Sequence, residues 1–158
     1  MSLRIAINGF GRIGRCIFRS VWNDPEIEIV HINDLTDDKT LAHLLQYDSV
    51  HRKFEAQVTS VEGGFNVDGK FVATSAIRNP TELPWAEKDV DIVLECTGVF
   101  RSEEKAGLHF QAGAKRVIIS APAKGGDVKT IVVGVNDNEL TADHKIVSNA
   151  SCTTNCLA

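Results

Sequence analysis

The stretch Gly9-Phe10-Gly11-Arg12-Ile13-Gly14 places three glycines between two segments of different periodicity. Before it, Leu3–Asn8 is an alternating run rich in Ile and Ala, which predicts a short strand; after it, apolar residues recur at helical spacing and predict a helix over residues 11–22. In such a unit the first glycine permits the tight turn, the second lets a pyrophosphate approach the backbone, and the third lets helix and strand pack closely. The free N–H groups at the helix N-terminus favour an anion. Glycines also cluster in simple turns, so the pattern needs a second signal.

Asp34 supplies that second signal. Ile27–Asn33 is predicted to be a second strand, and Asp34 stands at its end, 20 positions after Gly14. A carboxylate at this place accepts hydrogen bonds from the ribose hydroxyls of an adenosine and repels a 2′-phosphate. The sequence therefore predicts NAD rather than NADP as the cofactor. Arg12 is compatible with a solvated helix residue or with a contact to the pyrophosphate.

The rest of the chain continues the alternation of strands and helices, with one interruption. A helix is predicted from Asp38, with its leucines on one face. Short β-type runs, separated by glycine-containing turns at 62–64 and 68–69, then predict antiparallel hairpins. The later elements that we expect are strands at Val90–Glu95, Arg116–Ser120, Thr130–Val133 and Lys145–Val147, and a helix capped by Ser102. The sequence thus predicts an α/β fold of the Rossmann type, a mostly parallel sheet with an antiparallel hairpin insertion.

The composition argues against several classes of partner. The 158 residues carry a formal net charge of −4 without a long run of like charges, which gives no electrostatic reason to expect nucleic acid or an anionic membrane. The apolar runs, such as Ile131–Val135, are far shorter than a membrane span. Because the N-terminus lacks the layout of a signal peptide, we expect a cytoplasmic protein whose four cysteines are free thiols.

The cysteines fall into two kinds. Cys16, inside the first helix, and Cys96, at a strand end, are expected to be buried structural residues. Cys152 follows capping-type residues after a strand, so it falls in the first turn of a helix, where free N–H groups and the helix dipole favour the thiolate. From the spacing alone, Cys152 is compatible with a nucleophile or with a structural residue. Cys156, four positions on, is expected to be a packed helix residue.

Other uses of this thiol pair are less favourable. Side chains on one helix face point in parallel, which is poor geometry for a disulfide between Cys152 and Cys156. A metal would need more ligands than these thiols and His144 supply, so we expect no metal. A thiolate beside a nicotinamide is instead suited to aldehyde oxidation: the thiolate adds to the aldehyde, the carbon gives up a hydride, and a nucleophile releases the thioester that remains.

Five segments carry a resemblance to a known family. They are INGFGRIGR (Ile7–Arg15), INDLTD (Ile32–Asp37), LAHLLQYDSVH (Leu41–His51), IISAPAK (Ile118–Lys124) and SNASCTTNCLA (Ser148–Ala158). Through them the chain resembles glyceraldehyde-3-phosphate dehydrogenase over its whole length, and the last motif is the most specific. The resemblance implies an NAD-binding Rossmann domain over residues 1–148. Residues 149–158 are then the start of the catalytic-domain helix that carries the nucleophile.

The resemblance also implies the roles of single residues. Cys152 matches the nucleophile that carries the thiohemiacetal and thioester, and Ser151 and Thr153 match positions that contact substrate or phosphate. The positions that match cofactor contacts are Gly9, Phe10, Gly11, Arg12, Ile13, Asp34, Arg78, Thr97, Gly98, Phe100 and Ser120. Without the resemblance, Arg78 and Ser120 would be ordinary loop or strand-end residues.

The activity that the resemblance implies is oxidation of glyceraldehyde 3-phosphate with NAD and inorganic phosphate to an acyl phosphate, in a homotetramer. Erythrose 4-phosphate is the alternative substrate. Family members are longer, and the half absent here is implied to carry the phosphate-binding side chains and the histidine that pairs with the cysteine. None of the five histidines of this chain lies in that histidine's motif. By itself, the chain is expected to bind NAD without catalysing the reaction.

One departure from the family pattern concerns the backbone. After YDSVH the family usually has glycine, whereas this chain has Arg52. If the position requires a positive φ, Arg52 strains the turn. The alternative is a plain change of side chain at the surface.

Overall fold

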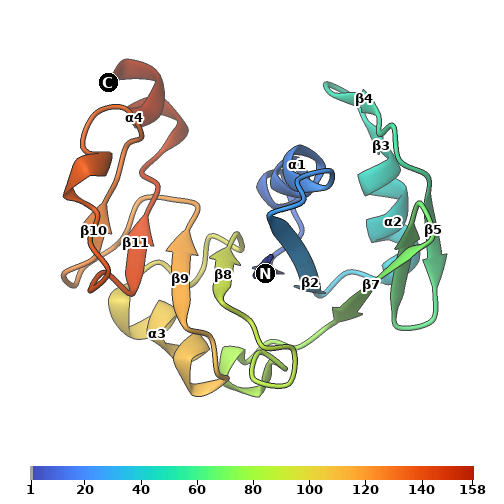
Figure 1. Ribbon diagram of the computed structural model, residues 1–158, viewed down its shortest axis with the longest axis horizontal. Helices are drawn as coiled ribbons and strands as arrows, with labels where there is room; N and C mark the ends of the chain where they lie inside the picture. The colour runs from blue at the N-terminus through green and yellow to red at the C-terminus, as the bar shows by residue number, and fades with distance from the viewer. Residues whose placement is uncertain (1) are drawn as a thin grey trace.

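The computed structural model describes residues 2–158, most of whose strands form one large mixed sheet (Figure 1). The nine strands lie in the order β10-β11-β9-β8-β1-β2-β7-β6-β5, which runs from left to right in Figure 1. Their bounds are β1 Leu3–Asn8, β2 Ile27–Asn33, β5 Val58–Val61, β6 Gly64–Val67, β7 Lys70–Ser75, β8 Ile92–Glu95, β9 Arg116–Ile119, β10 Lys129–Thr130 and β11 Ile146–Ser148. The α-helices are α1 Arg12–Val21, α2 Asp38–Gln46, α3 Glu103–Gln111 and α4 Cys152–Leu157. Short 3-10 turns lie at Pro80–Glu82 and Asp137–Glu139.

The central part of the sheet is parallel and doubly wound. Strand β1 pairs in parallel with β2 on one side and with β8 on the other. Alternate residues of β1 enter different cores, because Ile7 packs with Phe18 of α1 on one face and Ala6 packs with Trp85 on the other. Parallel strands covered on both faces confirm the predicted Rossmann-type arrangement.

The antiparallel insertion continues the same sheet. Strands β5, β6 and β7 pair antiparallel to one another, while β7 pairs in parallel with β2. Both turns use left-handed backbone, with Gly63 at φ 74° in one and Asp68 and Gly69 at 50° and 84° in the other. The predicted hairpins are therefore confirmed, and they extend one edge of the parallel sheet.

Three local expectations were wrong or incomplete. The strand expected at Thr130–Val133 stops at Thr130, because the Asn136 side chain accepts a hydrogen bond from Val132 N and donates one to the Thr130 carbonyl, so it takes the groups that a longer strand would use. Leu44 of α2 is 36% exposed, so it lies off the apolar face. The sequence reasoning also missed a small antiparallel pair, β3 (Tyr47–Asp48) and β4 (Arg52–Lys53).

Among residues 2–158 the structure contains no helix that is both long enough and apolar enough to cross a membrane.

Candidate dinucleotide site

The glycines of the first turn meet three different surroundings. Gly9 has φ 91°, and a Cβ on it would lie 2.6 Å from the backbone nitrogen of Thr97. A Cβ on Gly14 would lie 2.4 Å from the carbonyl oxygen of Gly9, so any side chain there would push α1 away from the strand. A Cβ on Gly11 would meet no protein atom within 4 Å. Gly11 thus borders open space, which leaves the backbone there accessible to a ligand.

The N-terminus of α1 is open as well. Its N-cap residue is Gly11, which has no side chain to satisfy the first N–H groups, and the first turn holds no acidic residue. The other helices of similar length are capped by Asp37 in α2 and Ser102 in α3. The uncapped N–H groups and the positive end of the helix dipole suit a phosphate group.

Asp34 faces this glycine turn and is held in place by backbone donors. Its Oδ2 accepts a hydrogen bond from Phe10 N at 2.7 Å, and its Oδ1 accepts one from Thr36 N at 2.9 Å. Each carboxylate oxygen has a second acceptor position, which these bonds leave available. The carboxylate is therefore oriented and can accept hydrogen bonds from a pair of hydroxyl groups.

A cavity of about 370 Å³ joins these features at the carboxyl ends of β1, β2 and β8. Six of the residues predicted to contact the cofactor line it: Gly9, Gly11, Asp34, Arg78, Thr97 and Phe100. The crevice beyond the carboxyl ends of parallel strands is where open α/β sheets bind their ligands. The fold thus gathers residues from widely separated parts of the sequence around one cavity.

The other predicted cofactor residues lie around this cavity without lining it. Phe10 is fully buried in the core, and its N–H is bonded to Asp34, so its contribution is to the shape of the turn. Ile13 is 51% exposed on α1. Gly98, at φ 74°, lies in the loop after β8, and Ser120 follows β9, where its N–H donates to the Glu95 carbonyl.

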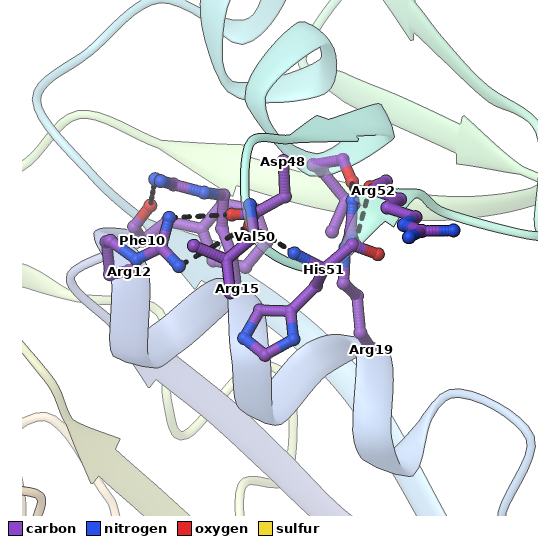
Figure 2. A network of polar contacts seen from close by, with 9 residues as sticks. Phe10, Arg12, Arg15, Arg19, Asp48, Val50, His51 and Arg52 are labelled. Atoms are coloured by element: carbon purple, nitrogen blue, oxygen red, sulfur yellow. Dashed lines mark hydrogen bonds and ion pairs between the residues drawn. The ribbon is translucent and has the colours of Figure 1, made fainter.

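Arg12 points to a neighbouring acid. Its guanidinium binds the Asp48 carboxylate, with 2.8 Å between Nη1 and Oδ2 (Figure 2). The N–H groups of His51 and Val50, and then the charge of Arg12, lower the pKa of Asp48 to about 2. The Arg12 side chain is half exposed at one end of α1, beside the open N-terminus.

Arg19 of α1 fastens the β3–β4 hairpin to the helix, because its guanidinium donates to the carbonyl oxygen of Arg52 in β4 (Figure 2). Arg19 also donates to the carbonyl oxygen of Leu45 in α2, while Arg15 donates to that of Phe10 in the glycine turn. Arg52 has φ 61°, so the position that is usually glycine in the family does require left-handed backbone here. Of the two alternatives for Arg52, strain in the turn is the one the backbone favours.

The sequence reasoning did not single out six other residues that line the cavity: Asn8, Asn33, Leu35, Ile77, Cys96 and Val99. A signal was present for the two asparagines, because each is the last residue of a parallel strand and so lies at the ligand-binding edge. Burial raises the pKa of the Cys96 thiol to about 11, which fits the expected structural role for this cysteine.

The predicted helix start at Cys152 is present. Ser151 is the N-cap of α4, and its hydroxyl accepts a hydrogen bond from Thr154 N at 3.0 Å. Cys152 is exposed in the first turn, and Thr153 beside it is exposed as well. Cys156 is also exposed, so the expectation of a packed residue was wrong; α4 extends from the end of β11 (upper left in Figure 1), and none of its residues is buried.

Among the described residues, no group of three or more His, Cys, Asp or Glu side chains is placed to hold a metal ion.

The doubly wound sheet, the open helix N-terminus after the glycine turn and the oriented acid at the end of β2 define a Rossmann-type dinucleotide-binding domain. Residues 3–103 match the family model described as the NAD binding domain of glyceraldehyde 3-phosphate dehydrogenase, and the chain belongs to this family.

Similar proteins agree with this assignment. The chain is 57% identical over 157 residues to the glyceraldehyde-3-phosphate dehydrogenase of Thermotoga maritima, an alignment that covers 98% of this chain and 47% of that protein. It is 54% identical over 159 residues to glyceraldehyde-3-phosphate dehydrogenase 1 of Bacillus subtilis and to the Geobacillus stearothermophilus protein, covering all of this chain and 47% of each relative. The chain thus spans about half the length of the curated relatives it matches.

Proposed function

We propose that this chain forms the NAD-binding part of a phosphorylating glyceraldehyde-3-phosphate dehydrogenase. The observation that carries the proposal is Asp34, whose carboxylate is oriented toward the cavity beside the uncapped N-terminus of α1. A dinucleotide needs both features, because its ribose supplies hydroxyl donors and its pyrophosphate supplies negative charge. The names of the relatives support the same substrate class.

Within that cavity we assign the cofactor contacts to the lining residues Gly9, Gly11, Asp34, Arg78, Thr97 and Phe100. The N–H groups at Arg12 and Ile13 face the pyrophosphate from the start of α1, and the Arg12 guanidinium adds a positive charge there. Gly98 is assigned with Thr97 and Phe100 to the adenosine end of the cofactor, and Ser120, which follows β9, is assigned to the nicotinamide end. NAD, when bound, accepts the hydride of the oxidised aldehyde.

In this proposal Cys152 is the nucleophile. Its thiolate sulfur adds to the aldehyde carbon and the aldehyde oxygen takes up a proton, which gives a thiohemiacetal; transfer of the hydride of that carbon to NAD and loss of the hydroxyl proton to a base leave a thioester. An oxygen of inorganic phosphate then attacks the thioester carbon, and the thiolate leaves as the acyl phosphate forms. Ser151 and Thr153, which flank Cys152 in the sequence, are assigned to contact substrate or phosphate.

Three finer parts of the proposal rest on the resemblance. The substrate is glyceraldehyde 3-phosphate, with erythrose 4-phosphate as the alternative for the same half of the protein. The full protein is a cytoplasmic homotetramer. The chain by itself is an NAD-binding module, because the remaining catalytic groups belong to the part of the relatives that it does not span.

The test is a calorimetric titration of the chain and of its Asp34→Ala variant with NAD. Loss of hydrogen bonds to a charged acceptor should weaken NAD binding about ten-fold or more. The preference for NAD over NADP should shrink at the same time, because the charge that repels the 2′-phosphate is gone.

Asp37→Ala is the matched control. Asp37 is an acid three residues further on that caps α2 by accepting from Thr40 N, and it does not line the cavity. Its loss should lower the melting temperature through the lost helix cap and leave NAD affinity unchanged. Identical cofactor titrations for Asp34→Ala and the parent would refute the ribose assignment.

A further inference from the structure

Five buried polar side chains extend from the wall of the dinucleotide cavity into the protein and form one hydrogen-bonded chain. In order they are Asn33, Asn8, Glu95, His109 and Trp85, which we call the buried polar chain; none is more than 4% exposed. They come from β2, β1, β8, α3 and the loop that follows Pro80–Glu82. Buried polar groups are costly unless they are paired, so a set this continuous fixes the elements that supply it.

Glu95 occupies the centre of this chain. Its Oε1 accepts hydrogen bonds from the backbone N–H of Thr97, at 2.8 Å, and from the Thr97 hydroxyl. Its Oε2 accepts from Asn8 Nδ2 at 2.6 Å and from His109 Nε2 at 3.0 Å. A carboxylate has about four acceptor positions, and the donors of Thr97, Asn8 and His109 fill all of them.

Trp85 fixes the direction of the bonds on the His109 side of Glu95. An indole N–H can only donate, and it donates to His109 Nδ1 at 3.0 Å. His109 therefore carries its proton on Nε2 and donates to Glu95. Because Nδ1 already accepts from Trp85, the only hydrogen bond that His109 Nε2 can make with the carboxylate is one that it donates.

Asn33, at the opposite end of the buried polar chain, holds another part of the cavity wall. Asn33 Nδ2 donates to Asn8 Oδ1 at 2.8 Å and to the Ile77 carbonyl at 2.9 Å, while Asn33 Oδ1 accepts from Ile77 N at 2.9 Å. Ile77 lines the cavity and precedes Arg78, which lines it too. Thr97, bound directly by Glu95, lines the same cavity from a different loop.

We propose that Glu95 is a positioning residue of the dinucleotide site. Its carboxylate orients Thr97 directly, and through Asn8 and Asn33 it sets the position of the segment that presents Arg78. The inference rests on the proposed binding of NAD in this cavity. It predicts that one buried acid, which touches no ligand itself, determines how well the adenosine half of the cofactor is held.

The test substitutes Glu95→Gln, a change that keeps the shape of the side chain. A glutamine amide replaces two acceptor positions with two N–H donors, and these then face either the donors of Asn8 and His109 or the N–H of Thr97. No orientation of the amide satisfies every neighbour. We expect NAD and ADP-ribose each to bind about ten-fold or more weakly, and the Thr97 amide signal to shift in a ¹⁵N-correlated NMR spectrum.

Trp85→Phe is the control for a merely structural effect. It removes the donor at the far end together with part of a buried ring, and it leaves the bonds of Glu95 to Thr97 and Asn8 in place. We expect a lower melting temperature, an unchanged Thr97 amide signal and an unchanged ADP-ribose affinity. If Trp85→Phe weakens ADP-ribose as much as Glu95→Gln does, Glu95 acts on general stability and the proposal is overturned.

Asn33→Ser decides the question if Glu95→Gln does not fold. A serine hydroxyl cannot make all the bonds of Asn33, so the Ile77 segment is released while Glu95 keeps Thr97. ADP-ribose should bind several-fold more weakly with the Ile77 amide signal shifted; an unchanged affinity counts against the proposal. A parent chain that binds no NAD refutes the proposed function, whereas a parent that binds and variants that bind equally well refute only the role of Glu95.

Discussion

Two carboxylates at strand ends take different roles because of what surrounds them. Asp34 is half-buried, and its backbone donors leave acceptor positions directed at the cavity. Glu95 is 1% exposed, and all of its acceptor positions are used within the protein. The first acid is suited to recognise a ligand, and the second is suited to hold the residues that do so.

The buried histidine His31 gives the protein a pH-dependent stability. Burial, and then the charge of Lys88, lower the pKa of His31 to about 4 from its ordinary 6.5. Its Nε2 hydrogen-bonds the Ser75 hydroxyl, and its buried Nδ1 has no partner, so a second proton would be unsatisfied. Because the unfolded chain takes up this proton first, stability is full above pH 6.5 and falls as the pH drops toward 4.

We expect the free energy of unfolding to fall by about 1 kcal/mol from this group alone between pH 7.5 and 5.5. Urea denaturation at the two pH values measures it, and His31→Gln should remove this part of the pH dependence. The exposed His43→Gln serves as control and should retain it. Equal pH dependence in the parent and in His31→Gln would show that another group is responsible.

The β3–β4 hairpin stores backbone strain at Arg52. A residue with a Cβ at φ 61° costs roughly 1–2 kcal/mol relative to glycine. The Arg52 carbonyl, which accepts from Arg19, is retained by glycine, so Arg52→Gly keeps the contact that fastens the hairpin to α1. We expect this variant to gain about 0.5–1 kcal/mol in stability after the entropy of the unfolded chain is included, which raises the melting temperature by roughly 1–4 °C.

Lys53→Gly is the neighbouring control, since Lys53 lies in β4 and is not among the residues with positive φ. At position 53 a glycine relieves no backbone strain, so only the entropic cost of glycine remains and the melting temperature should fall. Thermal unfolding followed by circular dichroism compares the two. A lower melting temperature for both variants would mean that Arg52 contributes contacts that outweigh the strain.

Elements with strong local signals could be predicted from the sequence. The strands β1 and β2 were expected with the bounds that the structure has, and Ser102 caps α3 as expected. The short β3 and β4 could not be predicted, because two-residue strands have no periodicity and depend on arginines of α1 for their position. Glu95 escaped notice for a similar reason, since its partner Asn8 lies 87 residues away along the chain.

At the scale of the whole molecule, stability and ligand binding depend on different parts of the sheet. Its two faces carry the two apolar cores, and its carboxyl edge carries the cavity. The candidate nucleophile lies at the end of a different strand, on the exposed α4. Both proposed sites therefore depend on the same edge of one sheet, although they share no lining residue.

We expect residues 1–158 alone to bind NAD but to show negligible phosphorylating dehydrogenase activity. The cavity with Asp34 is complete within the chain, whereas Cys152 is exposed and has no histidine bonded to it among the described residues. Calorimetric titration measures the first property, and NADH formation with glyceraldehyde 3-phosphate and phosphate measures the second. The full-length Thermotoga maritima relative is the positive control. Turnover by the chain at a rate comparable with that relative would contradict the assignment of a binding module.

The fixed direction of the buried polar chain has a consequence for how this sequence can change over evolutionary time. Every hydrogen bond of the buried polar chain runs from a donor toward Glu95, which only accepts, so replacing a donor by an acceptor reverses a polarity that its neighbour cannot match. An acid at position 8, for example, would place two carboxylates face to face unless position 95 changed as well. Among relatives, substitutions at these five positions should therefore occur together. A substitution found at one of them then indicates that at least one of the other four has changed as well.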